Sequence, residues 1–286
     1  MAARKQADPT GSLPDEGAVL PLAAHENFTV ASFLLGRQAR RHLLAIYGFA
    51  RLADQVGDEA AGDRLALLDE LEGELGLAFA GEPRHPVMRG LAPTVRELGL
   101  PREPFLRLIE ANRRDQQQSA YATHEELAGY CELSANPVGE LVLHVFGAAT
   151  PERIALSDSI CTGLQLIEHW QDVGEDARRG RVYLPSEDLE RFGVATDDLL
   201  GSRTGDRLRR LLAFEVGRAR ALLDEGAPLV GTLRGRARLA VAGYLAGGRA
   251  NADAIAAAEY DVLAGAPKAS GAKRLRATLA TYRMGG

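Results

Sequence analysis

The amino-acid sequence predicts an all-α protein, on three observations. Apolar residues recur at helical spacing along most of the 286 residues, Ala and Leu are abundant, and alternating runs of β-branched residues between turn signals are almost absent. With 46% hydrophobic residues the chain can bury a large core, and no Pro- or Ser-rich linker divides it internally. We therefore expect a single-domain helical bundle.

The order of the helices follows from the same spacing. We expect them at residues 28–36, 40–60, 63–80, 86–98, 103–119, 124–149, 151–178, 204–225, 228–247 and 252–264. Asp63, Thr123 and Thr204 are predicted N-caps, because their side chains can accept a hydrogen bond from the first helical turn. Thr123 is followed three residues later by Glu126, which is typical of a capping box.

Pro137 lies inside the expected helix 124–149 and predicts a kink there, because proline removes one backbone hydrogen bond. Gly139, two residues later, permits a close approach by another backbone or by a ligand. A pocket at this point and a packing adjustment without a ligand explain the pattern equally well.

The two ends of the chain differ from its middle. Residues 1–24 mix charges with Pro and Gly, resemble neither a signal peptide nor a membrane span, and are expected to form a disordered leader before a helical domain at 25–265. Residues 266–286 are locally basic and predict a solvated tail or terminal helix, with weak attraction to anionic lipid as the alternative. Charges interrupt every apolar run, so we expect a cytoplasmic protein, with peripheral contact at the inner membrane face as the alternative.

Overall charge and cysteine content exclude several function classes. A formal net charge of -5 and a pI near 5.8 argue against a general nucleic-acid binder, which needs a basic excess to displace counterions. Cys131 and Cys161 are too few for a disulfide framework and predict reduced thiols. The sequence contains neither a Walker A loop nor a Gly-x-Ser-x-Gly nucleophile elbow.

The segment YGFARLADQVGDE, residues 47–59, places polar side chains in an otherwise apolar helix. Four of them share one face, at offsets 0, 4, 7 and 11: Tyr47, Arg51, Asp54 and Asp58. Apolar residues cover the rest of the circumference, which is typical of a helix surrounded by protein. The polar stripe is therefore expected to face something internal.

A second stripe of similar spacing lies in the segment LQLIEHWQDVGED, residues 164–176. Its members, at offsets 0, 3, 7 and 11, are Gln165, Glu168, Asp172 and Asp176. Ionised carboxylates about 6 Å apart on a helix repel each other by about 3 kcal/mol at an effective dielectric constant of about 20. Two such columns facing one cavity need cations.

The residue types indicate which cation and which ligand. Oxygen ligands favour hard divalent ions, and Mg²⁺ is usually held by one or two carboxylates together with waters or phosphate oxygens. A phosphate ester is therefore expected, and its donors are Arg51, Arg178, Arg179 and Arg181. One aspartate pair alone is usually a solvated face, but here the surroundings are apolar and the pattern occurs twice. A di-iron bundle is the alternative, but it requires Glu-x-x-His on two helices, and the expected helices lack this motif.

The motifs DQVGDE from Asp54 and DVGED from Asp172 resemble those of the squalene and phytoene synthase family, which has the trans-isoprenyl diphosphate synthase fold. The run QDVGEDARRGRVYLPSEDL carries the aspartates, a Gly-Arg-x-Tyr-Leu-Pro sequence and an acidic turn together. This resemblance extends from about Glu26 to Ala264. Within the family, ENFTVAS and YCELSANPVGELVLHVFG look most like the bacterial hydroxysqualene synthases of the HpnC type.

The resemblance implies a role for each matching residue. Magnesium ions would be held by Asp54, Asp58, Asp172 and Asp176, and the diphosphate or its metals would be contacted by Tyr47, Arg51, Gln165, Arg181 and Tyr183. Glu168 departs from the family, which mostly has Asn there, so its carboxylate either joins the metal ligands or is neutralised by Arg or His169. Gln55 replaces the second Asp that many relatives have in the first motif.

The family's chemistry also implies a carbocation, which needs walls that attract a cation without reacting with it. Aromatic faces have this property. The candidates, each also explained by ordinary core packing, are Phe28, Phe49, Tyr130 and Phe146. A C30 substrate further requires a central apolar cavity, which the Ala- and Gly-rich helices near 134–149 and 239–248 can leave open.

The function implied is the Mg²⁺-dependent conversion of presqualene diphosphate and water to hydroxysqualene and diphosphate, a lyase reaction of hopanoid biosynthesis with no nicotinamide cofactor. The alternative within the family is a head-to-head prenyl transferase that makes presqualene diphosphate, squalene or phytoene. The alternative outside it is a non-catalytic helical lipid-binding module, whose function would tolerate Ala at Asp54 or Asp172. The expected partner is a prenyl diphosphate and not a nucleic acid.

Overall fold

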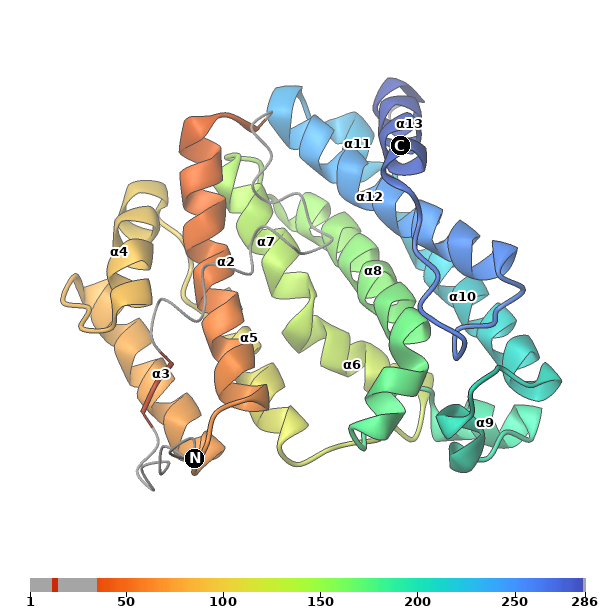
Figure 1. Ribbon diagram of the computed structural model, residues 1–286. Coiled ribbons are helices and arrows are strands. Elements are labelled where there is room, and N and C mark those ends of the chain that lie inside the picture. Colours follow the sequence, from red (N-terminus) through yellow and green to blue (C-terminus); the bar gives the residue numbers. More distant parts are fainter. Residues whose placement is uncertain (1–11, 15–34, 285–286) are drawn as a thin grey trace, which may run out of the picture. The chain divides into compact units, whose positions relative to one another are not determined.

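The computed structural model describes residues 12–14 and 35–284, and in this part of the chain it contains helices and no strand. A single isolated bridge joins Ala120 to Val182. The predicted all-α class is therefore confirmed. The chain divides into two compact units, residues 1–117 and 118–286 (Figure 1).

The described helices of the first unit are α2 (Arg37–Asp58), α3 (Arg64–Ala80), α4 (Pro86–Leu98) and α5 (Glu103–Asp115). Helix α2 packs against the other three, and its buried side carries Phe49 and Leu52, both fully buried. Phe49 meets Phe105 of α5 edge to face, with ring centroids 5.1 Å apart. This apolar contact joins α2 to α5.

The described elements of the second unit are α6 (His124–Ser134), α7 (Asn136–Val145), α8 (Pro151–Arg178), α9 (Ser186–Phe192), η3 (Thr196–Leu200), α10 (Asp206–Gly226), α11 (Leu229–Thr232), α12 (Gly235–Ala257) and α13 (Gly271–Met284). Helix α8 is the longest and packs against α6, α7, α10 and α12. Figure 1 shows α10 running beside it. A core cluster that includes Leu143, Ile160, Leu223 and Leu245 fills the space among these helices.

Small residues set how closely α8 and α10 approach. A Cβ atom added at Gly226 would lie 2.5 Å from the Leu156 carbonyl oxygen, and one added at Gly163 would lie 3.0 Å from the Ala219 carbonyl oxygen. Since both neighbours are backbone atoms, these positions leave no space for a side chain. The pair of helices therefore forms a rigid support for whatever side chains α8 presents on its other face.

The expected helix 124–149 is two helices rather than one kinked helix. Helix α6 ends at Ser134 and α7 begins at Asn136, so Pro137 falls in the first turn of α7, where its missing N–H costs nothing. A Cβ atom added at Gly139 would lie 2.4 Å from Ser157 Oγ of α8. The close neighbour that this glycine permits is therefore another helix.

The helix boundaries near the C-terminus also differ from the prediction. Helix α12 runs unbroken from Gly235 to Ala257, so the predicted break between 247 and 252 and the predicted helix 252–264 are wrong. The helix ends before Glu259 and Tyr260, which have the left-handed φ values 52° and 60°. Gly248 lies in close contact with the core, which keeps this glycine-containing stretch helical.

The predicted caps have mixed outcomes. Asp63 and Thr123 accept hydrogen bonds from Ala66 N and Glu126 N, as expected. Thr204 is not a cap, because Gly205 precedes α10 and the Thr204 hydroxyl accepts instead from Leu263 N. The short elements α9 and η3 were not predicted, since 7 and 5 residues are too few for a clear helical period.

One prediction concerns N-terminal residues that the structure does not describe, and another concerns membrane spans. The expected leader, apart from residues 12–14, and most of the expected helix 28–36 lie outside the described residues. Among the described helices, none combines the length and the apolar character needed to cross a bilayer.

Candidate active site

Helix α8 carries the second predicted stripe near its C-terminal end. Thr150 caps the start of the helix by accepting a hydrogen bond from Arg153 N, and the stripe begins at Gln165. Asp172 and Asp176 are partly buried, whereas Glu168 is exposed. Burial, and then repulsion from Asp176, raises the pKa of Asp172 above its usual value. A cation placed here would relieve that cost.

His169 links the members of the α8 stripe. Its Nε2 atom lies 3.1 Å from Gln165 Nε2, and its Nδ1 atom lies 3.9 Å from Asp176 Oδ2. The Tyr183 ring stacks on the imidazole, with centroids 3.7 Å apart and an interplanar angle of 16°. The imidazole is buried, so these contacts fix its orientation. His169 is thus a polar neighbour of the stripe.

The segment after α8 positions Arg181 and Tyr183. Gly180 adopts a φ of 81°, which favours glycine and turns the chain so that Arg181 N donates to Asp176 O at 2.9 Å. The segment then runs beside residues 119–122, and Val182 N donates to Ser119 O at 2.7 Å. These backbone bonds hold the Arg181 and Tyr183 side chains against the end of α8.

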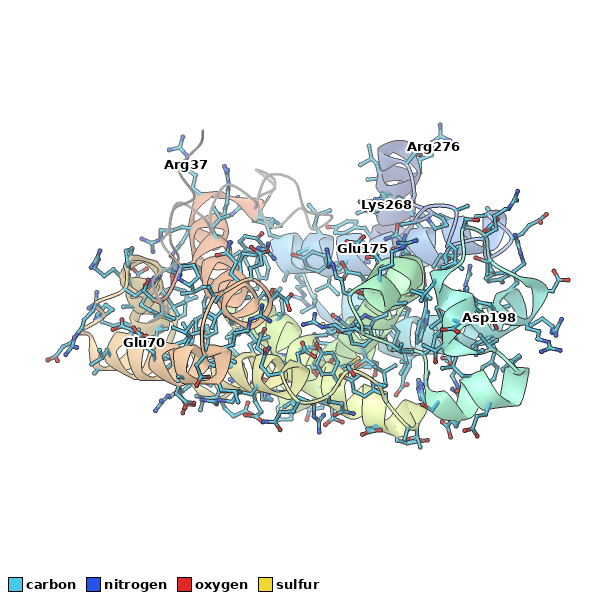
Figure 2. All side chains as sticks on the ribbon, turned by 60° about the horizontal axis from the view of Figure 1, so that its bottom comes forward. Arg37, Glu70, Glu175, Asp198, Lys268 and Arg276 are labelled. Atoms are coloured by element: carbon cyan, nitrogen blue, oxygen red, sulfur yellow. The ribbon has the colours of Figure 1, made fainter. Side chains whose placement is uncertain are left out.

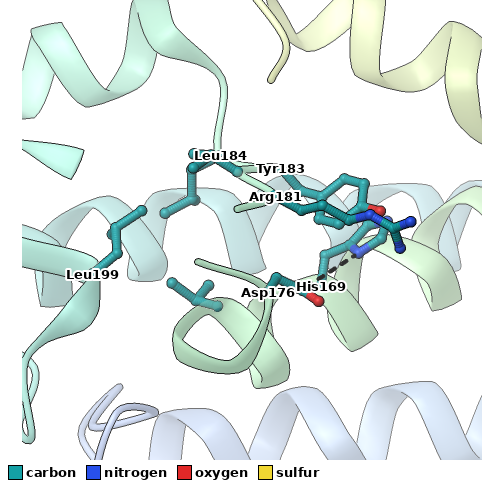
Figure 3. Close-up of a pocket in the computed structure, with 8 residues that line it drawn as sticks. His169, Asp176, Arg181, Tyr183, Leu184 and Leu199 are labelled. Carbon is teal, nitrogen blue, oxygen red and sulfur yellow. Dashed lines mark ion pairs between the residues drawn. The ribbon is translucent and has the colours of Figure 1, made fainter. Parts of the chain in front are cut away.

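A small pocket forms where this segment meets α8 (Figure 3). It is lined by His169, Val173, Asp176, Arg181, Val182, Tyr183, Leu184 and Leu199. One wall is polar and carries both a carboxylate and a guanidinium, and the other is apolar. Behind the Tyr183 ring lie the rings of Tyr121 and Tyr130, at centroid distances of 5.8 and 5.9 Å. Tyr130, a predicted cation wall, is therefore part of an aromatic cluster at this site.

A second segment, residues 262–270 after α12, lies along α8 on the side of Asp172. The Gln171 side chain donates a hydrogen bond to Pro267 O, and Ala269 N donates to the Asn251 side chain at 3.3 Å. These bonds hold the residues on both sides of Lys268. The positive charge of its ammonium group favours the ionised form of Asp172 and so opposes the larger upward shift in the pKa of Asp172 that burial causes. In Figure 2 the Lys268 and Glu175 labels mark this end of α8.

The first stripe lies on α2. Asp54 and Asp58 are exposed, and Asn112 Nδ2 of α5 donates to Asp54 Oδ1 at 3.4 Å. A Cβ atom added at Gly57 would lie 2.2 Å from Asn112 Oδ1, so the glycine leaves room for that amide. Gln116 also reaches α2, where its side chain donates to Gly57 O at 2.9 Å. Helix α5 therefore braces the motif from behind.

The upper part of the α2 stripe is more enclosed than the lower part. Tyr47 is half-buried, and the Arg51 guanidinium, 23% exposed, lies 3.6 Å from the Glu59 carboxylate. The sequence predicted that the whole stripe faces something internal, yet Asp54 and Asp58 are exposed. Ionised carboxylates keep their hydration unless a cation replaces it, which favours this exposure.

The apolar candidates occupy different surroundings. Phe49 is fully buried and packs on Phe105. These contacts fit the alternative of ordinary core packing rather than a wall for the cation. Phe146 is partly buried and packs against the core cluster of the second unit. Phe28 lies outside the described residues. The central apolar cavity stays a prediction.

The donor set can be tested against the expected metal. The described part of the chain contains no cluster of three or more His, Cys, Asp or Glu side chains able to hold an ion by themselves. Each stripe instead offers carboxylates four residues apart, Asp54 with Asp58 and Asp172 with Asp176. This set fits Mg²⁺, which keeps waters or phosphate oxygens as its remaining ligands, and does not fit a structural zinc or di-iron site.

Three residues of these sites escaped the sequence analysis. Asn112 and Lys268 lie 58 and 96 positions from the aspartates they approach, and no spacing rule joins residues so distant. Tyr121 follows a short turn after α5 and gave no periodic signal. Each becomes visible only when the helices are packed.

Comparison with known proteins places these sites in a family context. A family profile described as "Squalene/phytoene synthase" matches residues 22–279. The crystal structure of squalene synthase HpnC from Alicyclobacillus acidocaldarius is similar with a TM-score of 0.79 and 46% sequence identity, covering 86% of this chain and 94% of that chain.

Two curated relatives carry different activities in their names. Hydroxysqualene synthase from Rhodopseudomonas palustris is 37% identical over 213 residues, which are 73% of this chain and 72% of the relative. The 15-cis-phytoene synthase from Synechocystis is 34% identical over 251 residues, which are 83% of this chain and 74% of the relative.

Proposed function

The chain belongs to the squalene/phytoene synthase family, and we propose that within this family it converts presqualene diphosphate and water to hydroxysqualene and diphosphate. Members of the family are enzymes that act on prenyl diphosphates. The observation that carries the finer proposal is the 37% identity to a hydroxysqualene synthase. The 46% identity to the protein named squalene synthase HpnC supports it through the HpnC-type motifs that the sequence resembles.

The residues around α8 are suited to receive a diphosphate. Arg181 offers a fork-shaped guanidinium at the rim of the pocket, and its backbone N–H is already bonded to Asp176 O, which holds its position. The His169 ring, oriented by Gln165 and Tyr183, lies 3.9 Å from the Asp176 carboxylate. Held in this way, the donors require little rearrangement when negative charge develops on the leaving group.

The carboxylates of both stripes are proposed to hold Mg²⁺ through Asp54, Asp58, Asp172 and Asp176. When bound, Mg²⁺ supplies positive charge that neutralises the oxygens of the leaving diphosphate. Glu168 is exposed on the same helix, and we propose that it contacts the metal's water shell rather than the metal itself.

The proposed reaction needs no reductant. The carbon–oxygen bond to the diphosphate breaks, both electrons leave with the diphosphate, and the cyclopropylcarbinyl cation rearranges. Water then forms the new carbon–oxygen bond and gives up one proton, which the released diphosphate accepts. The buried rings of Tyr121, Tyr130 and Tyr183 form an aromatic cluster beside the pocket, which we propose excludes stray water and stabilises the nearby cation. A nicotinamide cofactor therefore has no role in this scheme.

The second candidate function is head-to-head condensation of two prenyl diphosphates to presqualene diphosphate, squalene or phytoene. The 34% identity to a phytoene synthase favours it. The two candidates differ in substrate, since condensation starts from farnesyl or geranylgeranyl diphosphate.

The deciding experiment incubates the purified protein and Mg²⁺ with presqualene diphosphate, and separately with farnesyl or geranylgeranyl diphosphate, and identifies the products by mass spectrometry. Hydroxysqualene from presqualene diphosphate without NADPH is expected. Product from farnesyl or geranylgeranyl diphosphate alone would support condensation instead. Product formation by an Asp172→Asn variant at the wild-type rate would contradict both enzymatic proposals.

A further inference from the structure

The terminal helix α13 buries its polar side and exposes its apolar side. It packs against α12, and the side chain of Thr281 in this contact is only 4% exposed. The Arg238 guanidinium of α12 lies 4.9 Å from the centre of the Tyr282 ring and donates a hydrogen bond to Tyr282 O. The helix is therefore held to the unit by polar and cation–π contacts rather than by its leucines.

The two leucines of α13 point away from this contact. Leu275 is 61% exposed and Leu279 is 46% exposed, and the first is the most exposed large apolar side chain among the described residues. Residues four apart share one side of a helix, so these leucines form a single outward apolar strip. A surface helix normally does the opposite. The strip therefore needs a partner outside the helix bundle.

The charges around the strip narrow the choice of partner. After Asp261 the sequence contains no Asp or Glu, and its cationic residues are Lys268, Lys273, Arg274, Arg276 and Arg283. The whole chain has a net charge of -5, so this basic segment has the opposite charge to the rest of the chain. In Figure 2 Arg276 extends outward from α13, away from the body of its unit.

We propose that the outward face of α13, defined by Leu275, Arg276, Leu279 and Arg283, docks on an anionic lipid surface. Apolar side chains next to arginines match the acyl and phosphate layers of such a surface. The acidic remainder of the chain is repelled by the same surface, so docking through α13 also sets the orientation.

The chemistry of the face favours lipid over other partners. A nucleic acid would be met by cations alone and gives exposed leucines no apolar contact. A second copy of α13 would bring two sets of cations together without compensating acidic residues, which is unfavourable. An anionic bilayer satisfies both the leucines and the arginines. The proposal rests on this face and is independent of the proposed reaction.

The test is flotation of the full-length protein with phosphatidylcholine vesicles made with and without phosphatidylglycerol, at low and at high salt. The wild type should float with the anionic vesicles at low salt, bind less at high salt, and bind neutral vesicles weakly. Replacing both strip residues, Leu275→Ser with Leu279→Ser, should weaken binding about tenfold or more, because two apolar side chains no longer enter the interface. Arg276→Glu should weaken it at least about fivefold.

Leu200→Ser is the matched control, because Leu200 is 49% exposed in the same unit but lies on η3 and not on α13. Its binding should equal that of the wild type, and circular dichroism should show equal helix content in all variants. Equal binding to neutral and anionic vesicles would overturn the proposal. So would wild-type binding by the double leucine variant, or a dimer in light scattering that this variant abolishes, which would identify the face as a contact between copies.

Discussion

The two aspartate stripes have nearly the same sequence spacing but different surroundings. On α2, Asp54 and Asp58 are exposed, and the side-chain amide of Asn112 donates a hydrogen bond to Asp54. On α8, Asp172 and Asp176 are partly buried beside an imidazole, a guanidinium and an ammonium group. The α2 motif is thus exposed to solvent, and the α8 motif is enclosed by groups that interact with its charge.

This difference indicates that metal binding stabilises the two motifs to different degrees. At the α8 stripe, burial raises the pKa of Asp172, so an ionised carboxylate there is costly until a cation arrives. At the α2 stripe, hydration already stabilises the carboxylates, and α5 braces the backbone behind them. We infer that the enclosed stripe gains more from metal binding.

Removing one carboxylate from either stripe should have the largest effect. Asp172→Asn and Asp54→Asn should each lower turnover by about a hundredfold to a thousandfold, because both remove charge that holds Mg²⁺ on the leaving group. Steady-state kinetics with presqualene diphosphate measure this loss. Asp253→Asn, on the exposed face of α12, is the control and should retain full turnover.

The same variants should differ in stability, which sharpens the contrast between the stripes. Without Mg²⁺, Asp172→Asn should raise the melting temperature, since it removes a partly buried charge and its repulsion with Asp176. Asp54→Asn should not raise it, because Asp54 is already hydrated. If both variants melt at the wild-type temperature, the proposed electrostatic difference is wrong.

Lys268 should matter next most, and only through the α8 stripe. Lys268→Met should reduce kcat about tenfold, because a cation near Asp172 and the leaving group is lost, while Lys268→Arg should restore most of it. Binding of inorganic pyrophosphate with Mg²⁺, followed by calorimetry, gives a readout that does not depend on turnover. Arg220→Met, a cation on the surface of α10, is the matched control.

The prediction for Lys268 fails if Lys268→Met binds pyrophosphate as the wild type does. It also fails if Arg220→Met loses as much activity as Lys268→Met, because the effect would then reflect overall charge. Either result would leave the α8 stripe with Arg181 as its principal cation.

Each aspartate motif contains one glycine, and these glycines should respond in parallel. A Cβ atom added at Gly57 would press on the Asn112 amide at 2.2 Å, and one added at Gly174 would press on Leu263 at 2.8 Å. Both neighbours are side-chain ends that can shift, so Gly57→Ala and Gly174→Ala should fold and lose turnover only about threefold to tenfold. Kinetics and thermal melting together measure the outcome.

Gly217→Ala is the control for these two substitutions. Gly217 is an exposed helical residue of α10 with open space around its α-carbon, so alanine there should stabilise the protein by up to about 1 kcal/mol and leave turnover unchanged. A similar gain at Gly57 or Gly174 would mean that their neighbours do not position the motifs.

The sequence predicted the helical class, most long helices and the composition of both stripes, because helical period and residue type are local properties. The resemblance to the squalene and phytoene synthases, and to their HpnC type, is confirmed by the family profile and by the 46% identity to an HpnC structure. The solvent exposure of the aspartates was not predictable, because no residue near Asp54 or Asp172 in the sequence shows that the first is exposed and the second partly buried. The chain after α12 packs along the Asp172 side of α8 through contacts of Gln171 with Pro267 and of Gly174 with Leu263, and these are tertiary contacts that no local pattern predicts.

The support behind the α8 stripe includes a buried carboxyl, and its expected effect is the smallest. Glu215 of α10 is fully buried, and burial followed by its hydrogen bond with Asp188 raises its pKa to about 8. Arg218 contacts both carboxyls, and the charged groups near Asp188 on α9 and α6 are Glu187, Arg191, His124 and Glu125. This cluster holds α9, which directly follows the segment that carries Tyr183.

The sign of the pH dependence follows from the raised pKa of Glu215. The folded state holds a proton that the unfolded state, with a pKa of about 4.3, has already released, so this contribution to stability is full at acidic pH and is lost as the pH rises to about 8. Glu215→Gln keeps a hydrogen-bond donor toward Asp188 and does not titrate. Relative to the wild type it should therefore melt a few degrees higher near pH 8, about 2–4 °C per kcal/mol, and show little difference near pH 5. Glu70→Gln, an exposed change in the first unit, should leave the dependence of melting temperature on pH unchanged. If the wild type and Glu215→Gln show parallel curves between pH 5 and pH 8, Glu215 does not hold a proton toward Asp188 behind the α8 stripe.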